Sequence, residues 1–552
     1  MPRVKTENKL RLFVFDELSK SSVFGLAAGK RPRMVARSFD FRRPILCRKI
    51  AIEIDAARIG ASSVQNPLQI EGRHQGEVQF VSEALQKCLQ QTVGGNHAFD
   101  FVTMHSAEDE NFCSAVGKTV GWDGKLQRGG AENEALHDFQ RIGPLGPKEQ
   151  EEKFLVSKLE HNSNGDLELD GVRLSSLVKE GDEPAYIYSR KGLIDRLFQF
   201  QSQIAKVLTQ RFSLHYAIKA NPHPQILKLF KQQNIGVDIV SGGELRRALE
   251  CGFAGAQVIF SGVAKTKDEI QQCLKAGIRQ FNIECASELR RIGEISAGSE
   301  KKVPVVFRIN PDVDAQTHPY ISTGFRENKF GMEKTQLAQA FEYLKQFPQL
   351  QLVGVSSHIG SQLREFSAVR EAIRIQRSVF EAWKSQGFPL VSFDVGGGLG
   401  IDYALDASTD AQWLEAYGQV LKEELAGLEA QIQFEPGRFL VARSGILLTQ
   451  IQYIKKTPDK NFLICNSGMN HLIRPALYGA IHRILPLQKK SGERIRADVV
   501  GPVCESSDFL GKDREFEGLG EGDWLAVADA GAYGASMASH YNLFSPAREI
   551  FV

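Results

Sequence analysis

The sequence has no pair of cysteines at a metal-binding spacing. Its eight cysteines are scattered over 552 residues without a Cys-x-x-Cys pair, whereas structural zinc sites and disulfide-stapled secreted domains both show recurring cysteine spacings. The pattern therefore argues against a zinc site and against a secreted disulfide scaffold. It favours a compartment in which thiols stay reduced.

The sequence also lacks a long apolar run and a strong net charge. No run approaches the roughly 20 apolar residues that cross a bilayer, and Lys9, Arg11, Asp16 and Glu17 interrupt any secretory segment at the N-terminus. The formal net charge is only +2, which gives no electrostatic case for nucleic acid. We therefore expect a cytoplasmic protein that binds neither membrane nor nucleic acid and recognises a small substrate through local charges.

Regular patterning is missing from the N-terminal extension, residues 1–152. Residues 1–50 hold 13 Lys and Arg against 4 Asp and Glu, no helix or strand period persists, and Gly143-Pro144-Leu145-Gly146-Pro147 has the composition of a linker. Three interpretations remain open: a flexible tail or misassigned start, a small partner-binding domain, or a cleaved organelle-targeting segment. Acidic residues from Glu7 onward count against targeting, because transit peptides are poor in acids.

The rest of the chain has a regular alternation of strand-like and helix-like segments. The strand-like runs are Leu214–Ala220, Gly236–Val240, Gln257–Ser261, Gln280–Glu284, Val303–Asn310, Leu350–His358, Val391–Val395 and Gln431–Glu435. The amphipathic stretches between them are Pro224–Gln233, Gly243–Cys251, Thr266–Ala276, Glu333–Phe347, Ser367–Ser385 and Ala411–Leu428. Such alternation is typical of a closed parallel barrel, so residues 191–440 are predicted to form an α/β fold, a (β/α)8 barrel.

The pattern changes again after the barrel. Four further runs are β-like with turn signals between them: Ile446–Lys455, Asn461–Asn466, Ala497–Val503 and Trp524–Ala528. Before the barrel, Leu167–Leu174 and Pro184–Ser189 read as short strands. We therefore expect a mainly β C-terminal domain over residues 441–552, joined by strands from residues 153–190.

Five barrel strands are predicted to end in residues that could react or bind a ligand: Lys219, Ser241, His358, Gly396-Gly397-Gly398 and Glu435. The βα loops of such a barrel converge on one face, so these residues should share one mouth. A buried lysine has a lowered pKa and can condense with an aldehyde, glycines can wrap a phosphate, and a carboxylate can keep a pyridine nitrogen protonated. Each feature also has an ordinary interpretation: a solvated loop lysine, a tight turn, or a salt bridge between Glu435 and Arg438.

Five motifs in order resemble the fold-type III pyridoxal-phosphate (PLP) decarboxylases, and within them the diaminopimelate decarboxylases. They are Tyr216-Ala217-Ile218-Lys219-Ala220-Asn221, His358-Ile359-Gly360-Ser361-Gln362, Gly396-Gly397-Gly398-Leu399-Gly400, Glu435-Pro436-Gly437-Arg438 and Cys504-Glu505-Ser506-Ser507-Asp508. The resemblance covers about residues 165–552 and includes a barrel insertion at residues 318–330. It implies a barrel of the alanine-racemase type, PLP as cofactor, and decarboxylation of meso-2,6-diaminopimelate to L-lysine and CO2, the last step of lysine biosynthesis.

The resemblance also implies roles for individual residues. Lys219 would attach the cofactor covalently, and His358 would stack on its ring. The other cofactor contacts would come from Ser361, Gly398, Glu435, Gly437, Arg438 and Tyr533, with Glu435 on the pyridine nitrogen. Substrate contacts would come from Arg438, Arg474, Tyr478, Glu505 and Tyr533, the first three on the distal carboxylate. In a homodimer with shared active sites, Cys504 of the partner subunit would return the proton and Glu505 of the partner subunit would bind the distal ammonium. No metal is implied.

Alternatives to this assignment stay open. The paired arginines Arg438 and Arg474 suit bidentate carboxylate binding, which favours a substrate with an amine and a carboxylate at both ends. Related enzymes act on ornithine, arginine or carboxynorspermidine, or racemise amino acids. A catalytically silent regulator would be expected to lose Lys219 or Cys504, and a PLP-free barrel could bind phosphorylated ligands. Ser507 departs from the glycine expected in many relatives, which affects only the local turn.

Overall fold

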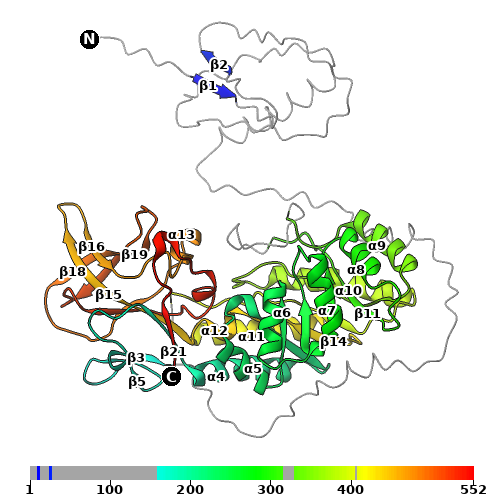
Figure 1. Cartoon of the computed structure of the whole chain (residues 1–552), viewed down its shortest axis with the longest axis horizontal. Coiled ribbons are helices and arrows are strands. Elements are labelled where there is room, and N and C mark those ends of the chain that lie inside the picture. Colours follow the sequence, from blue (N-terminus) through cyan, green and yellow to red (C-terminus); the bar gives the residue numbers. More distant parts are fainter. Residues whose placement is uncertain (1–8, 13–23, 28–157, 315–327, 405–406) are drawn as a thin grey trace. The chain divides into compact units, whose positions relative to one another are not determined.

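The computed structural model describes residues 9–12, 24–27, 158–314, 328–404 and 407–552 (Figure 1). The chain divides into two compact units, Met1–Ser106 and Ala107–Val552. In the first unit, β1 (Lys9–Leu12) and β2 (Phe24–Ala27) form an antiparallel pair, which the sequence analysis did not predict. The rest of the predicted N-terminal extension lies outside the described residues.

Eight parallel strands of the second unit close into a barrel in the order β10-β11-β12-β13-β14-β7-β8-β9. They are β7 (Phe212–Ala217), β8 (Gly236–Ile239), β9 (Val258–Phe260), β10 (Gln280–Ile283), β11 (Val303–Arg308), β12 (Leu350–Ser356), β13 (Ser392–Asp394) and β14 (Gln431–Phe434). The predicted fold class is confirmed, since the closed barrel has the strands in the predicted places.

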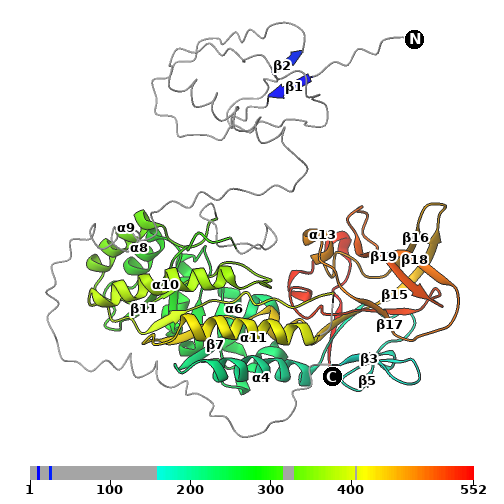
Figure 2. The same cartoon turned by 180° about the vertical axis from the view of Figure 1, so that it is seen from behind.

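Helices cover the outside of this barrel. They are α4 (Arg190–Val207), α5 (Pro224–Gln232), α6 (Gly242–Glu250), α7 (Lys267–Ala276), α8 (Ala286–Ile295), α9 (Lys334–Gln346), α10 (Ser367–Ser385), α11 (Ala407–Glu424) and the short α12 (Arg438–Val441), with 3-10 turns η3 (Ile218–Ala220) and η4 (Gly255–Gln257). Helices α6 and α7 lie on the side seen in Figure 1, and α4, α10 and α11 lie on the side seen in Figure 2.

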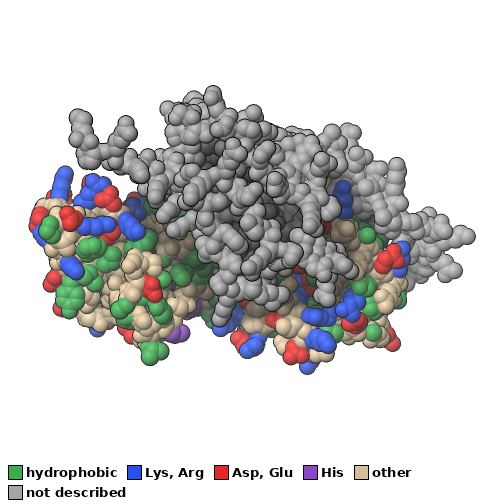
Figure 3. All heavy atoms as spheres, turned by 90° about the horizontal axis from the view of Figure 1, so that it is seen from above, with side chains coloured by type: hydrophobic (Ala, Val, Ile, Leu, Met, Phe, Trp, Pro, Cys, Tyr) green, Lys and Arg blue, Asp and Glu red, His purple; other side chains and the backbone are tan. Residues whose placement is uncertain are grey.

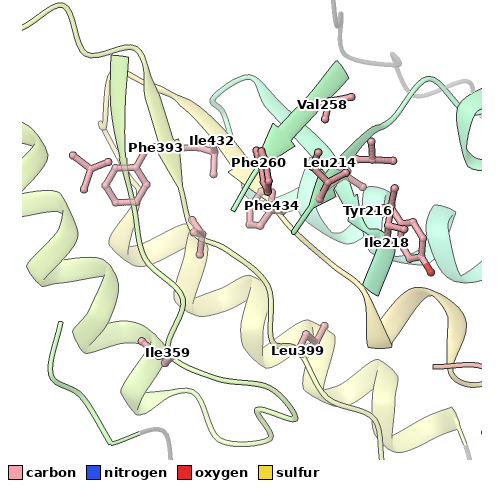
Figure 4. Packing of buried hydrophobic residues seen from close by; sticks show 14 of the residues in the cluster. Leu214, Tyr216, Ile218, Val258, Phe260, Ile359, Phe393, Leu399, Ile432 and Phe434 are labelled. Atoms are coloured by element: carbon pink, nitrogen blue, oxygen red, sulfur yellow. The ribbon is translucent and has the colours of Figure 1, made fainter. Parts of the chain in front are cut away.

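Apolar side chains alternate with polar ones along several barrel strands, β7 and β14 among them. On β7, Leu214 and Tyr216 belong to the buried core cluster, as do Ile432 and Phe434 on β14 (Figure 4). Successive residues of a strand point to opposite faces of the sheet. The apolar set therefore packs outward against the helices, and the residues between them point into the barrel.

Polar side chains form hydrogen bonds across the barrel interior. Gln280 on β10 donates to Gln433 on β14 at 3.1 Å, although these strands are not neighbours in the barrel. Asn282 on β10 likewise reaches Asp394 at the end of β13 at 3.4 Å. Bulky apolar residues are the usual filling of such barrels. In this barrel, hydrogen-bonded polar side chains of the interior instead lead to polar residues at the carboxyl ends of the strands.

Two predicted elements differ from the structure. Strand β7 ends at Ala217 rather than at Ala220, because the chain turns into η3 and places Lys219 just beyond the strand. The predicted strand Leu167–Leu174 is a hairpin of β4 (Leu167–Leu169) and β5 (Val172–Arg173). Its two turn residues, Asp170 and Gly171, have φ values of 50° and 85°, as a two-residue type I′ turn requires.

Helix α4 was not among the predicted helices, although its sequence carries clear signals. The Ser189 hydroxyl accepts a hydrogen bond from Gly192 N at 2.9 Å and caps the helix. Leu193, Leu197 and Phe200 then form a buried stripe at three- and four-residue spacing. This stripe packs against the barrel core.

A mixed sheet follows the barrel in the sequence and includes a strand from before it. Strand β6 (Ala185–Tyr188) pairs antiparallel with β15 (Gly445–Lys456) and parallel with β21 (Arg548–Phe551). The remaining strands of the sheet are β16 (Asn461–Cys465), β17 (Ile484–Pro486), β18 (Arg494–Val500), β19 (Phe509–Glu517) and β20 (Trp524–Val527). Helix α13 (Arg474–Tyr478), η2 (Leu174–Leu177), η6 (Ala535–Met537), η7 (Tyr541–Leu543) and β3 (Leu159–His161), which pairs with β4, complete the described elements.

The surface of the described residues carries both signs of charge. Basic and acidic side chains are interspersed on the face shown in Figure 3. Within the described ranges, no helix combines the length and the apolar character needed to cross a membrane.

Candidate active site

Lys219 lies at the barrel mouth, on the turn η3 that follows β7. Hydrogen bonds from two sides fix this turn. The hydroxyl of Tyr216 donates to Asn221 O at 3.0 Å, and Asn221 Nδ2 donates to Gly531 O at 3.0 Å. The backbone N–H of Tyr533 donates to Ala220 O at 2.8 Å. The loop after β20 therefore holds the lysine-bearing turn in place.

Asp238 at the end of β8 is the charged partner of Lys219. The Lys219 Nζ and Asp238 Oδ2 atoms are 3.2 Å apart, and the lysine side chain is 39% exposed while Asp238 is fully buried. Burial by itself lowers the pKa of Lys219, but nearby acidic groups, Asp238 foremost, outweigh burial and raise the pKa. The expectation that this lysine has a lowered pKa is therefore wrong, because Asp238 on a neighbouring strand supplies an acid.

Glu435 lies in a polar group at the top of the barrel interior. It accepts hydrogen bonds from Ser261 Oγ at 3.0 Å and from Asn282 Nδ2 at 3.2 Å. Burial, followed by the carboxyl groups of Asp238 and Asp394, raises the pKa of Glu435 well above its usual range. A cation placed beside a buried carboxyl group whose pKa is raised in this way favours the ionised form of that group. The salt bridge with Arg438 that was considered as an ordinary interpretation is not among the hydrogen bonds and ion pairs of the described residues.

His358 follows β12 and contacts the glycine turn after β13. Gly397 N donates to its Nδ1 at 3.2 Å, so this nitrogen carries no proton. Burial, followed by the positive charges of Arg308 and Lys219, holds the pKa of His358 well below its usual range. The imidazole is therefore neutral, as a ring that stacks on a flat cofactor can be.

The glycine turn itself requires glycine at Gly398. Its φ is 110°, and a Cβ there would lie 2.4 Å from Gly360 O. This turn lies beside the Glu435-Pro436-Gly437-Arg438 turn, since a Cβ on Gly397 would lie 2.2 Å from Glu435 O. The described hydrogen bonds give no acceptor to the N–H groups of Gly398 and Gly437. Two close glycine turns with free N–H groups suit a phosphate.

Arg438 and Arg474, here called the arginine pair, are both buried. Arg438 donates from Nη1 to the Tyr403 hydroxyl at 2.8 Å and from Nη2 to Ser361 Oγ at 2.9 Å. Arg474 donates from Nη1 to His482 Nε2 at 2.8 Å. No carboxylate of the described residues pairs with either guanidinium. Two buried cations without an acid form a site for an anion.

Aromatic side chains surround the arginine pair. The Arg438 guanidinium lies 4.7 Å from the centre of the Tyr533 ring, and Tyr533 adopts a φ of 56°, which is rare for a tyrosine. Tyr478 ends α13, the helix that begins at Arg474. The structure therefore brings Ser361, both arginines and Tyr533 together, with Tyr478 on the same short helix as Arg474.

Cys504 and Glu505 lie elsewhere, in the loop between β18 and β19. Both are exposed, and Glu505 accepts a hydrogen bond from the Tyr541 hydroxyl at 2.8 Å. The loop is shaped by Asp508, which accepts from Val503 N at 2.6 Å. Within the described part of one chain, neither Cys504 nor Glu505 contacts the barrel mouth. Most of the predicted insertion, residues 318–327, lies outside the described residues.

Sequence reasoning missed several residues of the site. Asp238, Asn282 and Asp394 were not named, although each interrupts an apolar strand at the alternate position and could have been found from that alternation. Tyr403 and His482 carry no local signal, since they follow no predicted strand. Ser241, which was named at a strand end, instead caps α6 by accepting from Glu244 N at 3.2 Å.

A comparison with protein families agrees with this geometry. Residues 193–442 match the family described as "Pyridoxal-dependent decarboxylase, pyridoxal binding domain", and these residues contain the barrel with Lys219, His358 and Glu435. The barrel and its mouth thus define the class: a pyridoxal-dependent decarboxylase with a barrel fold.

Similar proteins narrow the class. The chain is 39% identical to the diaminopimelate decarboxylase of Aquifex aeolicus over 389 residues, which are 70% of this chain and 91% of that protein. The enzyme of that name from Neisseria meningitidis serogroup B is 42% identical over 67% of this chain and 87% of its own length. The chain belongs to the diaminopimelate decarboxylase family.

Solved structures show the same fold. The diaminopimelate decarboxylase of Helicobacter pylori complexed with L-lysine matches with a TM-score of 0.63 and 38% identity, over 68% of this chain and 93% of that chain. The enzyme of that name from M. jannaschii in co-complex with L-lysine matches with a TM-score of 0.66 and 34% identity, over 72% and 92%.

Proposed function

We propose that the protein decarboxylates meso-2,6-diaminopimelate to L-lysine and CO2 with pyridoxal phosphate as cofactor, the last step of lysine biosynthesis. Family membership supports this reaction, and the observation that carries the substrate assignment is the arginine pair. Two buried guanidinium groups without an acid among the described residues lie in one site with the cofactor-binding motifs. A decarboxylase of a simple diamino acid needs no such receptor, whereas a substrate with a second carboxylate fits it.

The residues of the mouth fit pyridoxal phosphate. The Lys219 amine would attach it, while Ser361, Gly398, Gly437 and Arg438 offer hydroxyl, backbone and guanidinium donors for its phosphate. The pKa of Glu435 is raised by burial and then by neighbouring acids. A pyridinium nitrogen beside it would stabilise its ionised form. Neutral His358 would face the ring, and Tyr533 would complete the site. When bound, the cofactor would supply an electron sink for the bonding pair that stays on the substrate carbon as CO2 leaves.

The chain's own residues would bind the substrate and move protons. Arg438, Arg474 and Tyr478 would hold the distal carboxylate. Asp238 Oδ2, at 3.2 Å from Lys219 Nζ, keeps a proton on the amine and is placed to accept one when the amine reacts. The partner subunit's Cys504 would return a proton from its thiol, and the partner subunit's Glu505 would bind the distal ammonium.

A homodimer with shared sites is part of this proposal. Cys504 and Glu505 are exposed, Glu505 accepts a hydrogen bond from Tyr541, and Leu543 of the same turn η7 is 94% exposed. An apolar side chain left so open next to motif residues favours a face that a second copy covers. A thiol that must stay reduced also favours the cytoplasm.

Mixing two inactive variants tests the shared site. Lys219→Ala protein and Cys504→Ala protein should each be inactive, and equal mixing with verified subunit exchange should recover about a quarter of the wild-type activity, because half the dimers regain one of two sites. No recovery would contradict the shared site and leave the reaction itself untouched.

The reaction is tested on the purified protein. We expect absorbance near roughly 420 nm that borohydride removes, as a lysine-bound cofactor gives. Release of CO2 should be far faster with meso-diaminopimelate than with ornithine, arginine or carboxynorspermidine. A colourless protein that stays inert after addition of pyridoxal phosphate would overturn the proposal.

A further inference from the structure

Among the residues that the structure describes, only neutral groups form hydrogen bonds with the arginine pair. Every hydrogen-bond acceptor that the described residues offer it is a hydroxyl or an imidazole. Both guanidinium groups contact the Tyr403 side chain, so two like charges lie close together, and burial and then the charge of Arg438 lower the pKa of Arg474. Something must therefore orient two like charges without neutralising them.

His482 orients Arg474. Its ring is fully buried between two partners: Nδ1 lies 2.8 Å from Ala528 O, and Nε2 lies 2.8 Å from Arg474 Nη1. A carbonyl oxygen only accepts and a guanidinium only donates. Nδ1 must therefore carry the proton and Nε2 the lone pair. Only this neutral tautomer satisfies both contacts.

Tyr403 connects both arginines. Its hydroxyl accepts from Arg438 Nη1 at 2.8 Å, and the Arg474 guanidinium lies over its ring with Cζ 4.2 Å from the ring centre. The same ring meets His482 edge-on at a centroid distance of 5.0 Å. One buried side chain thus touches every member of the assembly through a hydroxyl, a ring face and a ring edge.

We propose that Tyr403 and His482 are positioning residues that hold Arg438 and Arg474 as a preformed receptor for a substrate carboxylate. This inference rests on the proposed function and assigns the preference for a second carboxylate to two residues outside the sequence motifs. An acid in either place would orient the arginines equally well but would compete with the substrate for them. A neutral hydroxyl and a neutral imidazole orient them and leave their charge available.

Binding of two small molecules to the holoenzyme tests the proposal. L-Lysine keeps the distal carboxylate, and 1,5-diaminopentane is the same molecule without it. His482→Leu removes the acceptor for Arg474 and should weaken L-lysine binding about ten- to a hundredfold, the cost of a hydrogen bond to a charged group. Binding of 1,5-diaminopentane should change by less than about threefold. With diaminopimelate, most of the loss should appear in KM rather than in kcat.

Conservative variants separate positioning from folding. His482→Gln keeps an acceptor and should recover most of the L-lysine affinity, whereas Tyr403→Phe keeps the ring, loses the hydroxyl and should weaken L-lysine binding about tenfold. Tyr417→Phe is the matched control, because Tyr417 is also buried but packs beside Phe366 away from the arginines. Its L-lysine affinity should equal that of the wild type. Melting temperatures of all variants show whether the fold survives, and Tyr403→Phe decides the matter if His482→Leu does not fold.

The outcomes distinguish this inference from the proposed function. If the wild-type holoenzyme neither binds L-lysine nor decarboxylates diaminopimelate, the proposed function fails. If the wild type does both, but Tyr403→Phe and His482→Leu bind L-lysine normally, the positioning roles are wrong. Equal weakening of L-lysine and 1,5-diaminopentane would also overturn them, because a general disturbance of the site does not discriminate by carboxylate.

Discussion

Two groups of buried arginines in this protein differ in one respect, the presence of acids. Arg196 and Arg443 form the first group, called the acid-paired cluster. Arg196 Nη2 lies 3.0 Å from Asp410 Oδ2, and Arg443 lies 2.8 Å from Asp410 and 3.1 Å from Asp529. These charges are neutralised within the fold. The cluster joins α4, α11 and the segment before β15, so its function is structural.

The arginine pair is equally buried, and none of the described residues supplies it with such an acid. Arg438 is 6% exposed and Arg474 is 4% exposed, against 0% for Arg196 and 5% for Arg443. Burying a guanidinium without a counter-charge costs free energy that the fold alone does not return. Burial is therefore the same for the structural arginines and for those proposed to bind substrate. What distinguishes them is whether a described acid pairs with the guanidinium group.

Removing the acid from the acid-paired cluster should have the largest effect. Asp410→Ala leaves two buried cations with fewer partners, and breaking a buried pair costs about 3–5 kcal/mol. We expect the free energy of unfolding, measured with urea, to fall by about that amount. Asp410→Asn, which keeps an acceptor of the same shape, should lose less. If Asp410→Ala were as stable as the wild type, the contrast between the two groups would disappear.

A substitution in the arginine pair should have the opposite effect, a large loss of activity with little loss of stability. Arg474→Ala should lower kcat/KM for diaminopimelate by about a hundred- to a thousandfold, because a buried charged contact to the substrate is lost. Stability should hardly change, because no acid is left unpaired. Steady-state kinetics and urea unfolding of the same preparation check both halves. Arg474→Lys is the matched control: it keeps the charge, loses the planar fork, and should recover only part of the efficiency. A stability loss as large as that of Asp410→Ala would place Arg474 among the structural arginines.

The sequence predicted the barrel well, because the relevant signals are local. Alternating strands and amphipathic helices appear in short windows, and the resemblance then named Lys219, Glu435 and the arginine pair. Which arginine meets which acid could not be predicted. Arg196 and Asp410 are 214 positions apart, and no local pattern connects them. The raised pKa of Lys219 was missed for the same reason, since Asp238 approaches it from another strand.

Two features of the site depend on more than local sequence. His482 follows α13 in an irregular segment, and its role appears only when Ala528 and Arg474 approach it from two sides. The role proposed for Cys504 requires a second copy of the chain, and one chain leaves it exposed. Both lie beyond what periodicity can reveal, because they are set by contacts between elements rather than within them.

The smallest expected effect is the pH dependence of stability that His482, the partner of Arg474, contributes. Burial, and then the positive charges of Arg474, Arg438 and Arg514, lower the pKa of His482 to about 3. In the unfolded chain a histidine takes up its proton near pH 6.5, so between pH 6.5 and 3 the unfolded state binds a proton that the folded state refuses. The contribution of His482 to the free energy of unfolding therefore falls as the pH is lowered, by at most about 1.4 kcal/mol for each unit.

Urea unfolding of the wild type and of His482→Gln between pH 7 and pH 5 measures this contribution, because glutamine does not titrate and the difference isolates His482. Over this range the wild type should lose about 2 kcal/mol more than the variant. The acid-paired cluster contains no histidine and contributes equally to both proteins. Parallel curves would mean that His482 accepts a proton in the folded protein, and the neutral tautomer between Arg474 and Ala528 would then be wrong.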